Sequence, residues 1–319
     1  MHLRPLIPAG LAAAVLAVPG LLHAQAGLTI QQKSTVNIAR ISNSELQQTI
    51  SILGSDRART VTSGRVKFLI ISADASGTEI VRLDQDQVIK LDDKKKKFEI
   101  LSLAQKRAEL AKQQRDAAKA AQAEEKSDVR YSVVVDEAGP TGERKEINGF
   151  STLQVRHRLT VVAENTKTGE KTPYLRIVSD SWVDPGQKEA AEIQAGYARA
   201  QVEALGLDPV AAGNPFARWL TDLKQEMAKV EGFPILSQVR FELAVDSTAA
   251  AAEPAEKPAP RGGLGGLGGL LGRGKSEEKK EEKPAGAPVV FSATVEVLSI
   301  SRTPPGAAEF EIPAGYAKK

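Results

Sequence analysis

The segment Leu153-Gln-Val-Arg-His-Arg-Leu-Thr-Val161 decides the fold class, because its side chains alternate without a break. Leucine, valine and histidine occupy the odd positions, and glutamine, arginine and threonine occupy the even ones. Side chains of a β-strand point alternately to the two faces of a sheet, so the pattern predicts a strand with one buried and one solvated face. Residues 174–183, which follow a turn at 165–169, are its predicted hairpin partner.

Short apolar segments on both sides extend this sheet. Most are bounded by glycine, by aspartate or by lysine-rich turns, which favours an antiparallel meander. A segment of weaker pattern runs to about residue 62, and a turn is predicted at 139–142. The other predicted strands are 28–41, 64–72, 78–84, 87–91, 97–101, the segment from 131, 235–245, 289–300 and a short closing segment at 310–312.

Helical patterns interrupt the strands at three places. Residues 103–125 contain no glycine or proline and are rich in alanine, lysine, glutamine and glutamate, which favours a helix. Their thin apolar stripe predicts an exposed helix, and a partner-binding helix is the alternative. A second helix is predicted at about 187–205. A third begins with Asn214 as its N-cap and Pro215 in its first turn, and its apolar face should pack on the sheet.

The N-terminal residues are typical of a signal peptide. Arg4 precedes an apolar run over 6–22, and Ala24-Gln25-Ala26 fits a cleavage site. We therefore expect residues 1–26 to direct export to the periplasm, with an uncleaved membrane anchor as the alternative. The sequence contains no cysteine, which excludes lipoprotein anchoring and disulfides.

The remaining chain is expected to form one domain with an insertion. Residues 27–247 and the C-terminal strands in 289–319 should belong to the same domain, whereas 248–288 consist mainly of alanine, proline, glutamate, lysine and glycine. That composition predicts disorder. The insertion contains a literal phosphate-loop pattern from Gly269 to Ser276, but no apolar strand precedes it and no amphipathic helix follows it. We therefore expect no nucleotide binding.

Side chains that support catalysis are few. Lysine and arginine number 43 against 40 aspartates and glutamates, which gives no basis for a nucleic-acid surface. After the signal peptide the only histidine is His157, which lies on the apolar face of its strand and is expected to be an interior residue. Asp180 and Asp184 could form a carboxylate pair, although capping of the strand end explains them equally well. We predict that the protein is not an enzyme and uses no cofactor or metal.

Several motifs, taken in order, resemble a bacterial family of exported proteins of unknown function. They are the strand 64–68, the hairpin over 78–91 with its Lys-Leu-Asp-Asp end, Ile147-Asn-Gly-Phe150, Ser179-Asp-Ser-Trp182, and the closing Phe310-Glu-Ile-Pro-Ala-Gly-Tyr316. The order of elements is also similar to that of the periplasmic lipoprotein carriers and related lipid-binding proteins. The helix at 103–125 and the insertion are extra to that plan.

The resemblance implies an α+β fold, in which a curved antiparallel sheet forms an incomplete β-barrel and helices pack on its concave face. It also implies a cavity for a lipid, an acyl chain or another hydrophobic ligand, so the expected function is that of a non-catalytic periplasmic carrier. A solid core is the alternative for the lining residues, and an envelope protein that binds another protein is the alternative function. The residues expected to line the cavity are Leu153, Val155, Leu159, Val161, Val239 and Phe241 on the sheet, and Trp219, Leu223 and Met227 on the third helix.

Overall fold

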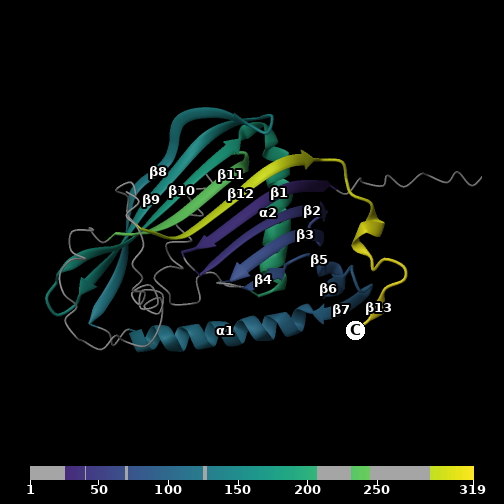
Figure 1. Cartoon of the computed structure of the whole chain (residues 1–319), viewed down its shortest axis with the longest axis horizontal. Coiled ribbons are helices and arrows are strands. Elements are labelled where there is room, and N and C mark those ends of the chain that lie inside the picture. Colours follow the sequence, from purple (N-terminus) through teal and green to yellow (C-terminus); the bar gives the residue numbers. More distant parts are fainter. Residues whose placement is uncertain (1–25, 40, 69–70, 125–127, 207–230, 245–287) are drawn as a thin grey trace, which may run out of the picture.

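The computed structural model describes residues 26–39, 41–68, 71–124, 128–206, 231–244 and 288–319, which form mostly one large, open, curved sheet with two α-helices (Figure 1). The helices are α1 (Leu103–Glu124) and α2 (Lys188–Ala204). The strands are β1 (Gly27–Ile38), β2 (Ser42–Leu53), β3 (Arg57–Phe68), β4 (Ile71–Asp74), β5 (Gly77–Arg82), β6 (Gln87–Asp92), β7 (Lys97–Ser102), β8 (Val129–Ile147), β9 (Phe150–Asn165), β10 (Lys171–Asp184), β11 (Phe233–Leu243), β12 (Val289–Ser301) and β13 (Ala317–Lys318).

The sheet is a meander in two halves that join at β1 and β12. The strand order is β13-β7-β6-β5-β3-β2-β1-β12-β11-β10-β9-β8, with β4 paired to β3. Every pairing is antiparallel except that of β13 with β7. Because β1 pairs with β12, a strand from the end of the chain lies between the first strand and β11. The predicted hairpin of β9 with β10 is confirmed, with Leu159 opposite Ile177 and Val161 opposite Leu175.

Two local expectations were wrong, and the sequence assigned no element to a third segment. The weaker segment before residue 62 forms two regular long strands, because β2 alternates half-buried residues with the exposed Asn43, Glu45 and Gln47. The predicted turn at 139–142 lies inside β8, where the glycines and the proline cause a register irregularity instead of a reversal. The closing segment at 310–312 is not a strand, since Phe310 ends a 3₁₀ helix, η4 (Ala307–Phe310).

Helix α2 packs against one face of the sheet. Tyr197 and Ala190 of the helix are buried, and they share one hydrophobic cluster with strands from both halves of the sheet. This packing is the main stabilisation of α2, because most of the stability of a protein helix comes from burying its apolar side. The sheet residues buried in this cluster are Leu28, Ile30, Ile52, Ala58, Phe233, Ile235 and Val297, with Ile147 from the β8 end.

The opposite face of strands β5 to β7 is covered by the C-terminal segment. Phe310 is fully buried among Leu53, Ile80, Ile89 and Leu91. Tyr316 packs at the edge of the same cluster, and its hydroxyl donates a hydrogen bond to Asp93 over 2.5 Å. The Phe310–Tyr316 motif of the sequence therefore covers this end of the sheet.

Helix α1 begins at the buried Leu103, and most of its described side chains beyond that residue are exposed, as its composition predicts. Arg107 holds it to the end of α2, because its guanidinium donates a hydrogen bond to the carbonyl oxygen of Ala204 over 2.7 Å. None of the helices in the described part of the chain is long and apolar enough to cross a membrane. The predicted third helix and residues 1–25 and 248–287, which were assigned to the signal peptide and the insertion, lie outside the described residues.

Gly232, just before β11, cannot be replaced without strain. Its φ is +124°, and an added Cβ would lie 2.4 Å from the carbonyl oxygen of Asp184. We expect Gly232→Ala to lower the free energy of unfolding by about 1–3 kcal/mol or more, measured by urea denaturation. Gly196→Ala is the matched control, because Gly196 lies in α2 with open space around it. The control should stabilise the protein by about 0.5–1 kcal/mol, and an equal effect of both variants would contradict the prediction.

Candidate ligand-binding face

The side of the sheet that contacts α2 can be followed across the strands from their register. Ile30 of β1 lies opposite Ile50 of β2, and both contribute to the cluster under α2. Residues two apart in a strand, and residues opposite each other in neighbouring strands, share a face of the sheet. Gln32, Ser34 and Val36 therefore follow Ile30 on the same side, which we call the α2 face.

Two neighbouring rows of residues on the α2 face consist largely of small side chains. Many residues of these two rows are half-buried. On the other face of the same strands, Asn37, Asn43 and Lys67 are exposed. Short side chains rise less far above the sheet than long ones do, and we call this pair of rows the trough. Its rows, in cross-strand order, are Ser181, Ser237, Val295, Ser34 and Leu46, then Ser179, Val239, Ala293, Val36, Ser44 and Val66.

Larger apolar side chains border the trough. On one side lies the row Leu159, Ile177, Phe241, Phe291 and Ile38, in which the rings of Phe241 and Phe291 are 5.0 Å apart. On the other side lies the hydrophobic cluster beneath α2. The trough and its borders together make an apolar band that crosses the strands between β9 and β3.

The structure brings together four of the predicted lining residues. Leu159 and Val161 are buried in one hydrophobic cluster, against which Val239 and Phe241 pack. Val155 is buried on the same face, and Leu153 is half-buried opposite Val183, near the α2 end of β9. The predicted partners Trp219, Leu223 and Met227 lie outside the described residues.

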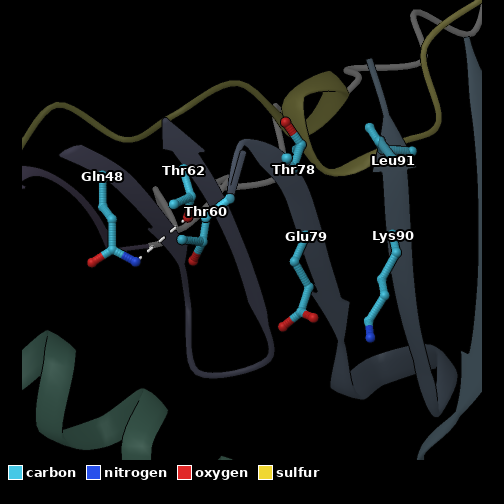
Figure 2. Close-up of a pocket in the computed structure, with 9 residues that line it drawn as sticks. Gln48, Thr60, Thr62, Thr78, Glu79, Lys90 and Leu91 are labelled. Atoms are coloured by element: carbon cyan, nitrogen blue, oxygen red, sulfur yellow. Dashed lines mark hydrogen bonds between the residues drawn. The ribbon is translucent and has the colours of Figure 1, made fainter. Parts of the chain in front are cut away.

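A polar groove of about 410 Å³ adjoins the trough at strands β2, β3, β5 and β6 (Figure 2). Glu79 of β5 and Lys90 of β6 are cross-strand partners, and their side chains extend side by side toward the α2 side. Thr78 and Leu91 point away from them. The sequence reasoning missed this groove, because its residues come from four separate strands. The lining residues are Gln48, Thr60, Thr62, Ala75, Gly77, Thr78, Glu79, Lys90 and Leu91.

Hydrogen bonds connect the groove to the trough. Gln32 donates from Nε2 to Oε1 of Gln48 over 2.9 Å, and Gln48 donates from Nε2 to Oγ1 of Thr62 over 3.5 Å. Gln32 lies next to Ser34 along the α2 face of β1. Tyr197 of α2 is close enough to Glu79 to be affected by its charge. Burial raises the pKa of the Tyr197 phenol, and the Glu79 carboxylate raises it further.

The carboxylates considered as a catalytic pair serve separate structural purposes. Asp184 caps a 3₁₀ helix, accepting a hydrogen bond from the amide of Gly186 over 2.8 Å. Asp180 does not cap the strand end. Its Oδ1 accepts hydrogen bonds from Arg156 over 2.6 Å and Gln154 over 3.2 Å, and Arg240 lies 3.7 Å from Oδ2. Arg156 lies opposite Asp180 in the β9–β10 pairing, so this contact depends on the strand register.

The structure also places His157 and the acidic side chains of the described part of the chain. His157 is 2% exposed, in agreement with an interior position. The described residues contain no group of three or more His, Asp or Glu side chains placed to hold a metal ion. No known family model matches the chain, and no curated protein matches it at a significant level.

Proposed function

We propose that the protein is an exported, non-catalytic carrier that binds a lipid or another apolar ligand along the α2 face of its sheet. In this proposal the curved sheet is an incomplete barrel, α2 lies on its concave side, and the chain works in the periplasm. The observation that carries the proposal is the apolar band of half-buried side chains that crosses the strands and ends at a polar groove.

The sizes of the side chains in the band favour a long, thin ligand. Serine, alanine and valine occupy most of the trough, whereas phenylalanine, isoleucine and leucine border it. Apolar ligand sites are typically concave and lined by hydrophobic side chains with a few polar groups that fix orientation. An acyl chain lying along the trough would contact apolar side chains on both borders, and its burial would contribute about 0.8 kcal/mol per CH₂ group.

A tryptophan in the trough should block the ligand. Ser44 lies between Val36 and Val66 in the small-residue row and is half-buried. We expect Ser44→Trp to weaken binding of a fluorescent sixteen-carbon fatty acid by about tenfold or more, which corresponds to about 1.4 kcal/mol. Fluorescence titration measures the affinity, and thermal unfolding checks that the variant is folded.

Asn43→Trp is the matched control. Asn43 is the preceding residue of β2 and is exposed on the other face, so the same ring there should leave the affinity unchanged. Equal losses in the two variants would contradict the position of the site. Native mass spectrometry of the protein purified from the periplasm tests the carrier function directly, because a bound mass that extracts as a lipid is expected. A bare chain in repeated preparations that also fails to bind the fatty acid would overturn the proposal.

A further inference from the structure

The polar groove presents two opposite charges side by side. Glu79 and Lys90 are directly opposite each other in the β5–β6 ladder, and Thr60 lies opposite Glu79 on the other side. The ion pairs formed by the described residues include none between Glu79 and Lys90. Lys90 is exposed and Glu79 is half-buried, so both charged groups are accessible to a ligand.

Uncharged polar groups surround this pair. Thr60 and Thr62 supply hydroxyl groups that both donate and accept hydrogen bonds, and Gln48 supplies an amide. Gly77 and Ala75 contribute almost no side chain, and a Cβ added at Gly77 would meet only the carbonyl oxygen of Leu91, at 3.8 Å. The groove therefore has free space beside a cation, an anion and several hydrogen-bonding groups.

We infer that the groove binds the zwitterionic headgroup of a phospholipid that carries a phosphate and a primary amine. This inference rests on the proposed function, since it specifies the polar end of the same ligand. The Lys90 ammonium and the threonine hydroxyls complement the phosphate, and the Glu79 carboxylate complements the ammonium. A headgroup with only negative charge would be attracted by Lys90 and repelled by Glu79, so the pair selects for a ligand with both charges.

The position of the groove orients the lipid. Gln32, Gln48 and Thr62 connect the groove to the start of the trough at Ser34 and Leu46. A headgroup in the groove would therefore place its acyl chains along the apolar band.

The test compares two lipids with identical acyl chains, phosphatidylethanolamine and phosphatidylglycerol, each offered in vesicles to the full chain. Native mass spectrometry measures the fraction of protein carrying one lipid. We expect the wild type to prefer phosphatidylethanolamine by about tenfold. Glu79→Lys should reverse the preference toward the anionic lipid. The double variant Glu79→Lys, Lys90→Glu should restore the preference for phosphatidylethanolamine, because it exchanges the charges without removing either.

Glu146→Lys is the control for net charge, because it makes the same change of charge as Glu79→Lys at an exposed residue of β8, outside the groove. It should leave the preference unchanged. Binding of both lipids with equal affinity would overturn the headgroup inference and leave the proposed function standing. Uptake of neither lipid by a chain that still binds the sixteen-carbon fatty acid would overturn the headgroup inference alone, and failure to bind the fatty acid as well would overturn both. Binding of free O-phosphoethanolamine by a chain that takes up neither lipid would show that the groove recognises a small solute, and would overturn the lipid assignment.

Discussion

Replacing Phe310 by alanine should lower the free energy of unfolding by about 3–5 kcal/mol. Phe310 is fully buried, and its ring packs on Leu53, Ile80, Ile89 and Leu91 from three strands. Its removal leaves a cavity beneath η4 that the regular strands cannot close by a small movement, and cavity formation adds to the lost transfer free energy. Urea denaturation of the full chain, followed by circular dichroism, measures the change.

The control for Phe310→Ala is Arg302→Ala. Arg302 is exposed and makes a surface ion pair with Glu189 of α2 over 3.1 Å. Surface ion pairs contribute little, so this variant should lose no more than about 1 kcal/mol. A loss below about 1 kcal/mol for Phe310→Ala would show that the C-terminal segment does not pack on the sheet in solution, and the side of the sheet opposite the α2 face would then be uncovered.

Periodicity alone predicted the strands whose two faces differ most in polarity. β9 alternates leucine and valine with glutamine and arginine, and its structure follows that alternation. β2 was left unassigned because serine and glutamine occupy both of its faces, and its half-buried side is apparent only when β1 and β3 lie beside it. Glycine and proline at 139–142 predicted that the chain would reverse its direction. Instead β8 continues through these residues and pairs with β9 on both sides of them.

The candidate site depends on register, which the sequence does not specify. Alternation places Ser34 and Val36 on one face of β1 and Ser44 on one face of β2, but only the pairing shows that these small residues form continuous rows. Bulges also shift which residues lie opposite each other. Between Gln31 and Gln32 of β1, the partner strand β12 contains an additional residue. The burial of Leu159 and Val161, against which Val239 and Phe241 pack, could be predicted because burial follows alternation. Glu79 and Lys90 meet only through the β5–β6 hairpin.

Replacing Arg82 by methionine should lower the free energy of unfolding by about 3 kcal/mol or more. Arg82 is 5% exposed, and its guanidinium binds both carboxylate oxygens of Asp84, over 2.9 and 2.8 Å. It also donates to the carbonyl oxygen of Phe310 over 3.3 Å and pairs with Glu311. Methionine keeps the apolar volume but leaves these acceptors without their cation. Arg82→Lys should have an intermediate effect, because lysine keeps the charge and loses the two-pronged contact.

The loss of unfolding free energy caused by Arg82→Met should become smaller in acid. The hydrogen bond from Arg82 is the main cause that lowers the pKa of Asp84 below its usual value. A carboxylate whose pKa is lowered by folding contributes stability above its unfolded pKa of about 3.9, and this stability is lost as the pH falls through the folded pKa. The difference in unfolding free energy between wild type and Arg82→Met should therefore be constant near neutral pH and shrink as the pH falls below about 4. Urea denaturation of both proteins between about pH 2 and 7 measures it. A difference that stays the same in acid would show that the Asp84 contact contributes nothing, and that the loss comes from the contacts of Arg82 with the C-terminal segment alone.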